Sequence, residues 1–279
     1  MPDDAPSLAA LLRGAERTVV FTGAGVSTDS GIPDFRSPGG IWTRYDPREF
    51  TFDRYVESAD TRRRSWAMRR EFWAVAPRPN AAHLAVAALE SAGRVSGVMT
   101  QNIDGLHQAA GSRVVVELHG TAREVTCIGA SPRGGVPDGC GFRADTRWAF
   151  DRIDAGDEDP ACPRCGGLVK SATVSFGQAM DAGALERAAM LFAHADLVLA
   201  VGSSLQVYPA AALPERAAAA GVPLVIVNAE PTPLDDLAAL VLHTRATPLL
   251  QEVAALVLED GPAVDRRDGA RAGPRPSER

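Results

Sequence analysis

Five short runs of apolar, mostly β-branched residues recur along the chain, and each is followed by residues that favour turns. They are 18–25 (TVVFTGAG), 95–102 (VSGVMTQN), 114–120 (VVVELHG), 196–204 (DLVLAVGSS) and 223–230 (PLVIVNAE). Continuous apolar strands of this kind are typical of a parallel sheet that is buried on both faces. Because helical patterns lie between several of them, the alternation predicts an α/β fold with a Rossmann-like parallel sheet and helices on both faces.

Three segments between these runs have the pattern of helices. Residues 80–93 offer Asn80 as an N-cap and Gly93 as a C-terminal stop, and 184–195 and 210–223 follow the same periodicity. Two other segments interrupt the alternation: one is rich in arginine and aromatic residues, the other in glycine, proline and cysteine. We therefore predict a larger Rossmann-like domain from 1–40, 90–120 and 172–258, and a smaller inserted domain of a helical and a cysteine-containing module from 41–89 and 121–171. A disordered tail is predicted over 259–279.

Composition limits the classes of partner and compartment. The chain has 279 residues, is 46 % hydrophobic and carries a formal net charge of −6, which supports a large core and does not indicate a nucleic-acid surface. Its basic cluster at 62–70 is typical of a solvated helix face. No run of 18 apolar residues predicts a membrane span, and the acidic start is unlike a secretory signal. We expect a cytoplasmic protein with reduced thiols, no nucleic-acid partner and no membrane partner.

The four cysteines fall into two pairs. Cys162 and Cys165 are separated by two residues, whereas twelve residues separate Cys127 from Cys140. Paired cysteines in a reducing compartment favour a tetrahedral metal site over a disulfide. The long first spacing does not exclude one, because loop-closure entropy grows only logarithmically with length. A metal site with an insertion and four thiols without a metal are both open at this point.

A glycine pair follows the first apolar run. Gly23-Ala24-Gly25 would let the backbone turn tightly and approach a pyrophosphate at the start of a helix. The ordinary dinucleotide fingerprint is incomplete, however, because Thr28 stands where its third glycine belongs and no acidic residue ends a second strand. A plain strand–helix turn explains these glycines equally well.

Six segments together resemble the motifs of the sirtuin family of NAD-dependent protein deacylases, with the features of its class II branch. They are 23–36 (GAGVSTDSGIPDFR), 100–107 (TQNIDGLH), 118–120 (LHG), 176–177 (FG), 202–205 (GSSL) and 227–228 (VN). They occur in the family's order and spacing from about residue 18 to 250, so the chain is identified as a member.

The resemblance implies NAD at the switch point of the sheet, consumed as a co-substrate. The residues implied are Gly23, Ala24, Gly25, Asp34, Phe35 and Arg36 on the diphosphate and ribose side; Gln101, Asn102, Ile103 and Asp104 around nicotinamide; and Gly202, Ser203, Ser204, Asn228 and Ala246 around the ribose and phosphates.

The resemblance also implies a general base, His119, with Asn102 and Asp104 as further catalytic residues. Histidine suits this role because its ordinary pKa, near 6.5, lets it accept a proton at neutral pH. In the family the acyl-lysine oxygen attacks C1′ of the nicotinamide ribose and expels nicotinamide. The base then activates the ribose 2′-oxygen, and the products are free lysine, nicotinamide and O-acyl-ADP-ribose. His107 is interpreted as structural.

An acyl-lysine protein or peptide would add as a strand along Val174, Ser175, Phe176 and Gly177, with Gln178 where the family often has Glu. The succinyl-selective branch has Tyr three residues before Arg, and the nearest match here is Trp66 with Arg69. This does not favour a carboxylate-binding pocket, although Arg69 leaves one open. Acyl preference is therefore not predicted.

The family places one structural Zn²⁺ where Cys127, Cys140, Cys162 and Cys165 occur, although Ala130 stands where it has the second cysteine. We expect zinc, bound more weakly than by two close pairs. The predicted function is an NAD-dependent protein-lysine deacylase. Mono-ADP-ribosyl transfer from the same NAD site is the alternative, and a zinc-ribbon binding module with a degenerate nucleotide fold is an alternative of another class. An ordinary dehydrogenase fits least.

Overall fold

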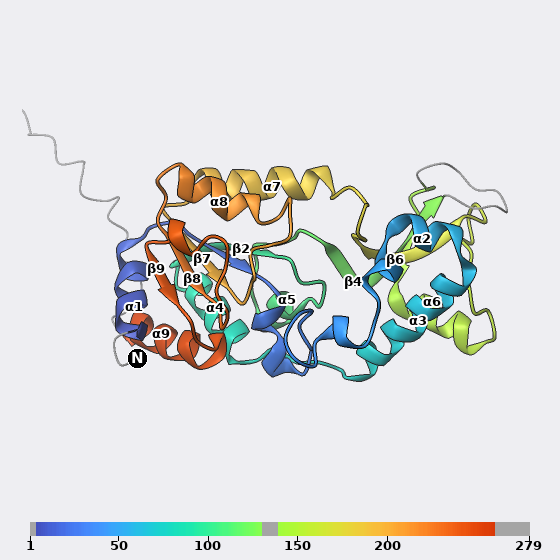
Figure 1. Ribbon diagram of the computed structural model, residues 1–279, viewed down its shortest axis with the longest axis horizontal. Coiled ribbons are helices and arrows are strands. Elements are labelled where there is room, and N and C mark those ends of the chain that lie inside the picture. Colours follow the sequence, from blue (N-terminus) through green and yellow to red (C-terminus); the bar gives the residue numbers. More distant parts are fainter. Residues whose placement is uncertain (1–3, 130–138, 260–279) are drawn as a thin grey trace, which may run out of the picture.

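The computed structural model describes residues 4–129 and 139–259 (Figure 1). Apart from Glu259, which ends the last helix, the predicted tail lies outside the described residues, as does most of the long loop between the first two cysteines. Within the described residues no helix combines the length and the apolar character that a membrane span requires.

A six-stranded parallel sheet forms the larger part of the molecule. Its order is β3 (Val115–Glu117), β2 (Val95–Thr100), β1 (Thr18–Thr22), β7 (Leu197–Val201), β8 (Leu224–Val227) and β9 (Leu240–Leu242). Every residue of β1, β7 and β8 is buried, which is why their sequences are continuously apolar, apart from the terminal threonines of β1, rather than alternating. The predicted fold class is confirmed, and the five predicted strands all belong to this sheet.

Helices cover both faces of this sheet (Figure 1). On one face α1 (Asp4–Gly14), α4 (Ala81–Ser91) and α9 (Ala246–Glu259) pack together with alternate strand residues such as Val20. On the other face α7 (Ala182–Ala193) and α8 (Ala212–Ala219) pack on the intervening residues, Val19 and Phe21. The short α5 (Leu106–Ala110) follows β2. Side chains that alternate along each strand thus supply two separate cores.

The predicted helix limits at Asn80 and Gly93 are correct. The Asn80 carboxamide oxygen accepts hydrogen bonds from the backbone N–H groups of Ala82 (2.9 Å) and His83 (3.4 Å). In return, the backbone N–H of Asn80 donates to the His83 ring nitrogen Nδ1 at 3.3 Å. This is a capping box at the start of α4. Gly93 follows the helix with φ of 74°, a left-handed conformation that favours glycine.

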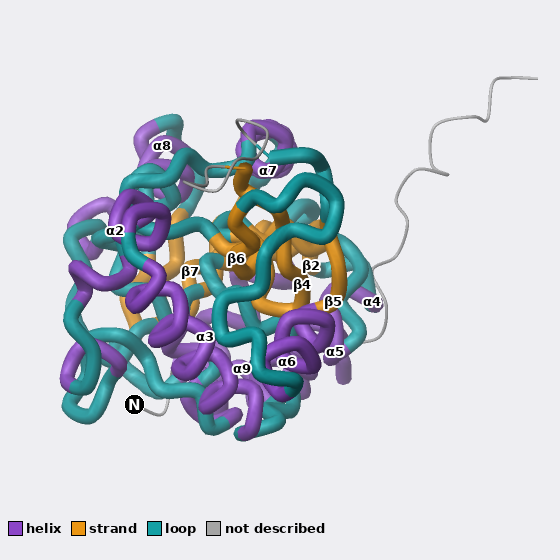
Figure 2. Tube along the Cα trace, turned by 90° about the vertical axis from the view of Figure 1, so that its right-hand side faces the viewer, coloured by secondary structure: helices purple, strands orange, loops and turns teal. Residues whose placement is uncertain are grey.

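The smaller part contains a three-stranded antiparallel sheet in the order β5 (Arg143–Asp145), β4 (Gly120–Gly129) and β6 (Leu168–Thr173). Its helices are α2 (Phe52–Glu57), α3 (Ala59–Ala74) and α6 (Thr146–Asp154). Figure 2 shows α3 beside α6, where Trp66 and Phe150 share a core with the cysteines. Across both parts, short 3₁₀ helices lie between the helices and strands, at Ala24–Val26, Thr28–Ser30, Ile41–Thr43, Pro47–Phe50 and Asp235–Leu237.

The basic cluster on α3 is not the uniform solvated face that its composition indicates. Arg62 is buried, and its guanidinium donates to both carboxylate oxygens of Asp159 at 2.8 Å. The pair ties the helix to the loop before the last two cysteines. Desolvated arginine is tolerated here because a bidentate carboxylate and two backbone oxygens satisfy it.

The division into domains stays a prediction. The residues 41–89 were assigned to the smaller domain, but α4 packs against α9 and joins the core of the six-stranded sheet. We propose that the boundary falls just before Asn80, and that β6, which pairs with β4, belongs with the smaller sheet.

Candidate functional site

The loops that follow β1 and β7 meet at the carboxyl ends of these strands. The N–H of Gly25 donates to the carbonyl oxygen of Gly202 at 2.8 Å, and the N–H of Gly23 donates to that of Val201 at 3.1 Å. A Cβ atom at Gly25 would lie 2.8 Å from the Gly202 Cα, and one at Gly202 would lie 2.4 Å from the Val26 nitrogen. Both positions therefore need glycine so that the two backbone loops can touch. The sequence pattern alone does not predict this contact.

This meeting point is also where the order of the sheet reverses. The strands that follow β1 in the chain extend the sheet on one side of it through β2 and β3, and on the other through β7, β8 and β9. Open α/β sheets bind dinucleotides at such a switch point, outside the carboxyl ends of the strands. An exposed guanidinium, that of Arg36, is held here by a 3.2 Å hydrogen bond to the Ser204 hydroxyl. The backbone loops and this cation suit a diphosphate.

The segment after β2 is held against the glycine loop by a buried polar network. The Asn102 amide nitrogen donates to the carbonyl oxygen of Gly23 and to the Ser27 hydroxyl, both at 3.1 Å. The Ser27 hydroxyl donates to the Asp104 carboxylate at 2.8 Å. Ser27 was not predicted as a site residue, although it lies in the first quoted motif. The signal available was its place directly after the glycine turn.

Gln101 joins the ends of β2 and β7. Its side-chain amide donates to the Ser203 hydroxyl at 2.7 Å, and this hydroxyl also accepts a 3.2 Å bond from the N–H of Leu205. Leu205 is buried and has φ of 52°, which is unusual for a residue with a side chain. Ile103 accepts a 2.8 Å bond from the N–H of Ala122 at the start of β4. The four residues 101–104 thus contact both loops and the smaller sheet.

His119 is fixed in one tautomer by the backbone. Its Nδ1 lies 2.9 Å from the carbonyl oxygen of Gln101, which can only accept, so Nδ1 carries the proton and Nε2 is the acceptor of the neutral ring. Burial lowers the pKa of His119 below its usual value, and the bond to Gln101 offsets part of that shift. The imidazole is therefore neutral at pH 7, the state that a general base requires.

Two other histidines are structural in this arrangement. His107 is buried, its Nε2 lies 3.0 Å from the Thr22 hydroxyl, and its ring is 4.9 Å from that of His83. Burial, and then the neighbouring His83, lower the pKa of His107 to about 3, so it stays uncharged. The His83 Nε2 lies 3.4 Å from the Ser27 hydroxyl, so the two rings adjoin the Asn102 network.

The predicted peptide strand begins next to His119. The N–H of Val174 donates to the His119 carbonyl oxygen at 2.8 Å, and the Phe176 carbonyl oxygen accepts a 2.8 Å bond from the N–H of Phe52. Phe176 is about half exposed, at 48 %. The ring centroid of Trp42 lies 6.0 Å from that of Phe176 and 5.1 Å from that of Phe35. Three aromatic rings therefore line the route between the glycine loop and this strand.

Gln178, where the family often has Glu, closes a turn after the peptide strand. Its side-chain oxygen accepts a 3.1 Å bond from the N–H of Ser175, while its own N–H donates to the Ser175 carbonyl oxygen at 3.0 Å. Gly177 between them has φ of 79°. A side-chain oxygen at position 178 therefore closes the turn after the strand.

Three further predicted residues hold their own loops. The Asp34 carboxylate accepts from the N–H groups of Arg36 (2.9 Å) and Ser37 (2.8 Å). The Asn228 amide donates to the Glu230 carbonyl oxygen at 2.7 Å, just beyond β8. Ala246 is buried at the start of α9, which contacts the 3₁₀ helix of the glycine loop. Asp34 and Asn228 lie in loops at the carboxyl edge of the sheet, and Ala246 begins the helix that follows β9.

The four cysteines form one cluster. Their sulfur atoms all lie within 4.8 Å of one another, with 3.6 Å between Cys127 and Cys165 and 3.5 Å between Cys140 and Cys162. A tetrahedral zinc ion with bonds of about 2.3 Å needs sulfurs about 3.8 Å apart, so the donor set fits zinc. Gly139 has φ of 84°, and a Cβ there would lie 2.2 Å from the Cys127 carbonyl oxygen. The predicted cysteines are thus brought together despite the long spacing.

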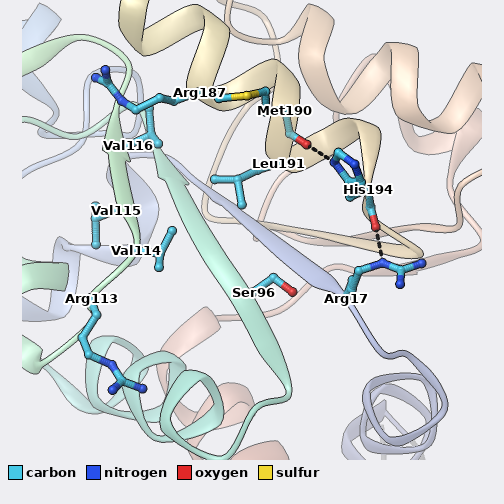
Figure 3. A pocket seen from close by; sticks show the side chains of 10 residues that line it. All are labelled: Arg17, Ser96, Arg113, Val114, Val115, Val116, Arg187, Met190, Leu191 and His194. Carbon is cyan, nitrogen blue, oxygen red and sulfur yellow. Dashed lines mark hydrogen bonds between the residues drawn. The ribbon is translucent and has the colours of Figure 1, made fainter. Parts of the chain in front are cut away.

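A cavity of about 590 Å³ lies away from all of these residues (Figure 3). Its floor is formed by Val114, Val116, Met190 and Leu191, between β3 and α7, and it includes none of the predicted site residues. It lies toward the amino ends of the strands, where Ser96 and Arg17 line it. The candidate site is therefore defined by the loops at the opposite edge of the sheet.

A parallel sheet with a loop contact at its switch point, joined to a cysteine metal centre, defines a nucleotide-binding α/β protein with an inserted metal module. The Sir2 family matches residues 23–209, and the chain belongs to this family, the sirtuins. It is 48 % identical over 231 residues to an NAD-dependent protein deacetylase 2 of Streptomyces coelicolor, covering 81 % of this chain and 92 % of that protein.

Two solved structures are similar throughout. A Sir2 enzyme with a deacetylated p53 peptide and 3′-O-acetyl ADP-ribose has a TM-score of 0.80 and 36 % identity, covering 92 % of this chain and 98 % of that one. A Sir2 complex with p53 peptide and NAD⁺ has a TM-score of 0.77 and 36 % identity, covering 91 % and 97 %. The similarity includes both the six-stranded sheet and the cysteine module.

Proposed function

We propose that this protein is an NAD-dependent protein-lysine deacetylase that releases nicotinamide and O-acyl-ADP-ribose. The observation that carries the proposal is the His119 imidazole, neutral and with Nε2 free to accept a proton, beside the 101–104 segment. The relatives named as NAD-dependent protein deacetylases, and the Sir2 complex that contains a deacetylated peptide, support the same reaction.

NAD would be held by the two loops at the switch point. Gly23, Ala24, Gly25 and Arg36 would surround the diphosphate, and Gly202, Ser203 and Ser204 would approach it from β7. When bound, NAD supplies an electrophilic ribose carbon from which nicotinamide can leave. Asn102 and Asp104 act in this proposal by holding the nicotinamide side of the site, which their bonds to Gly23 and Ser27 pre-organise.

The remaining residues predicted to bind NAD complete this site. They are Asp34 and Phe35 in the loop after β1; Gln101 and Ile103 beside Asn102; and Asn228 and Ala246 at the far end.

His119 would remove a proton from the ribose hydroxyl after the acyl-lysine oxygen has displaced nicotinamide. The Gln101 carbonyl stabilises the imidazolium that forms, because it accepts from Nδ1–H in both protonation states. The aromatic rings of Phe35, Trp42 and Phe176 would exclude water from the reacting ribose. The peptide would pair with the backbone of Val174, Ser175, Phe176 and Gly177.

Among acyl groups we propose acetyl as the preferred one. Trp66 stands where the succinyl-selective branch has tyrosine, and it is 2 % exposed within the core around the cysteines. Its position therefore offers no hydroxyl to an acyl carboxylate. Zn²⁺ would be held by the four cysteines and support the smaller sheet without taking part in the reaction. We propose the cytoplasm as the compartment, because the metal centre requires reduced thiols.

The test is a panel of acetyl-, succinyl- and long-chain acyl-lysine peptides with NAD, followed by mass spectrometry for wild type and His119→Ala. We expect deacylated peptide and O-acyl-ADP-ribose from wild type, most of all with acetyl-lysine. A protein that gains ADP-ribose while the peptide stays acylated would instead indicate mono-ADP-ribosyl transfer. Absence of nicotinamide release from NAD under all conditions would contradict both activities.

A further inference from the structure

A second cavity, of about 280 Å³, lies in the smaller part of the molecule, between the helices α2 and α3 and the end of β6. Residues that define it are Tyr55, Thr61, Arg69, Lys170 and Ser175. Ser175 is the one residue of the proposed peptide strand that lines it, and no residue assigned to NAD does. The cavity is therefore a separate site behind the peptide strand.

Lys170 is a buried cation without a carboxylate. Its side chain is 2 % exposed, and its ammonium donates to the carbonyl oxygens of Thr173 and Ser171, the latter at 3.2 Å. An ammonium has three donors, so these two bonds leave one N–H available to a ligand. Burial, and then the charge of Arg69, lower the pKa of Lys170 to about 7.

Arg69 places a second cation on the same wall. Its guanidinium donates to the Thr173 hydroxyl at 3.0 Å. Within residues 4–129 and 139–259, no carboxylate lies within ion-pair distance of either Arg69 or Lys170. Lys170 is buried, whereas Arg69 is partly exposed. Two neighbouring cations that lack a counter-charge, one of them removed from water, destabilise the fold unless an anion joins them.

The acids near the cavity are already paired with other arginines. Glu71 accepts from Arg44 and from the Tyr45 hydroxyl, and Glu49 lies 3.1 Å from Arg64. Each of these acids is thus neutralised at the mouth of the cavity. The inner wall keeps its positive charge.

Thr61 adds an unsatisfied hydroxyl. Its side chain is 2 % exposed and lines the cavity, and its Oγ1 has no hydrogen-bond partner in the described part of the chain. It lies in the first turn of α3, a helix of 16 residues, whose N-terminus contributes a positive partial charge. Tyr55, by contrast, is satisfied, because its hydroxyl donates to the Val169 carbonyl oxygen at 2.8 Å.

We propose that this cavity binds a small free anion, a phosphate or a short dicarboxylate, through Lys170, Arg69 and Thr61. An anion has the acceptor oxygens that these donors lack, and its charge compensates both cations. The volume is below the range of drug-sized ligands, which selects a compact occupant. The mouth is lined by Tyr45, Glu49, Arg64 and Glu71 of the helical insertion, so the anion enters from that side rather than past His119.

The bound anion would act on the peptide strand. Lys170 and Arg69 both bond to Thr173, and the next residue, Val174, donates to the His119 carbonyl oxygen. Fixing Thr173 therefore fixes the backbone to which the peptide pairs. This kinetic consequence rests on the proposed deacetylase function, whereas anion binding itself does not.

The binding test is calorimetric titration of the full-length, zinc-loaded protein with inorganic phosphate and with succinate, at constant ionic strength set with sodium chloride. We expect saturable binding to wild type and a loss of at least about tenfold in affinity in Lys170→Met, Arg69→Met and Thr61→Val. Arg70→Met is the matched control, because Arg70 lies on the same helix, is exposed and pairs with Asp154. Equal binding to all variants, or none to wild type, overturns the site.

The kinetic test measures KM for an acetyl-lysine peptide with and without the anion. We expect the anion to lower KM several-fold at unchanged kcat in wild type, and to have no effect in Lys170→Met. Binding without any change in KM overturns the effector role. A protein that binds the anion but shows no turnover of any acyl-peptide contradicts the proposed function and leaves the site intact. No binding of free anions, with Lys170-dependent binding of a succinyl-lysine peptide, would assign the cavity to a substrate acyl chain and overturn the proposal.

Discussion

The Nδ1 atom of His119 lies 2.9 Å from the carbonyl oxygen of Gln101. The carbonyl cannot donate, so this one contact sets the tautomer, orients the ring and directs the basic Nε2 away from the sheet. The same Gln101 reaches the Ser203 hydroxyl with its side chain at 2.7 Å. Gln101, which directly follows β2, therefore connects the proposed base to the loop that follows β7.

Replacing His119 by alanine removes the proposed base. We expect His119→Ala to lower kcat/KM for O-acyl-ADP-ribose formation by at least about 100-fold, the contribution typical of a positioned general base. The fold should persist, because the backbone contacts of residue 119 do not use its side chain. Quantitative mass spectrometry of the products checks this, with circular dichroism as the control for folding. Undiminished product formation in a folded variant would contradict the base role.

The pH dependence of the rate follows from the direction of the His119 shift. Burial lowers its pKa below the ordinary 6.5, and the base must be unprotonated to work. We therefore expect kcat/KM to rise with pH and to reach its plateau with a midpoint below pH 6.5. Rates between pH 5 and 8 at saturating NAD give this midpoint. A midpoint clearly above 6.5 would indicate that another group limits the reaction.

Replacing Gly120 and Gly93 by alanine separates the cost of a strained backbone from the cost of a steric clash. Both have left-handed φ, 72° and 74°, but a Cβ at Gly120 would lie 2.1 Å from the Ala172 carbonyl oxygen, whereas Gly93 has open space. We expect Gly93→Ala to cost about 1 kcal/mol from φ alone. Gly120→Ala should cost about 3 kcal/mol or more and reduce activity, because the contact joins β4 and β6 beside His119. Urea unfolding measures both, and equal costs would argue against the clash.

The cysteine cluster should bind one zinc ion per chain. We expect Cys140→Ser and Cys165→Ser each to lower bound zinc well below one equivalent and to lower the free energy of unfolding, because zinc binding energy is folding free energy in such modules. Elemental analysis after purification without chelator, together with thermal unfolding, checks this. Restoration of the unfolding temperature by added zinc in chelator-treated wild type is the control. Full stability and activity at near-zero zinc would contradict a structural metal.

Lys170 should make stability depend on pH. Its pKa of about 7 in the folded protein is below the ordinary lysine value of 10.5, so between these values the unfolded chain binds more protons than the folded one. Stability contributed by this group therefore rises from pH 7 to 10.5, by up to about 1.4 kcal/mol per pH unit, and is constant below 7. Arg69 of α3 is the charge that acts on it most directly, and Tyr55 of α2 lines the same cavity, with Tyr45, Glu49, Arg64 and Glu71 farther along its wall. Comparing urea unfolding of wild type and Lys170→Met between pH 6.5 and 9 tests this; parallel curves would contradict it.

Five of the strands in the large sheet were predictable because each is mostly apolar and is followed by turn residues. The ends of the strands were less predictable. The run at 114–120 gives only β3 (Val115–Glu117), because the chain turns at His119 and Gly120 into β4. The sequence analysis assigned no element to β9 or α9. β9 has only three residues, two half-buried and one buried, which is too short to show a period. The apolar stripe of α9 can be interpreted only once α1 and α4 are known to pack against it.

Residues of the candidate site were predictable from motifs, but their contacts were not. The glycines were expected to approach a ligand, and the structure shows Gly25 against Gly202 instead. Ser27 and the turn closed by Gln178 depend on side-chain directions that spacing does not encode. Arg62 belongs to a basic cluster in the sequence, yet it is buried because Asp159, far along the chain, pairs with it.

The order of strands has a consequence for synthesis of the chain. Thr18 in β1 pairs with Leu197 in β7, whereas its other neighbour, β2, is complete at Thr100. A ribosome delivers the N-terminal half first, so one edge of β1, a fully buried strand, has no backbone partners until β7 is synthesised. Unpaired strand edges are where nascent chains associate wrongly. β1 therefore reaches its final pairing only after the second half of the chain has been synthesised. Its unpaired edge is most open to wrong association while the chain is still on the ribosome.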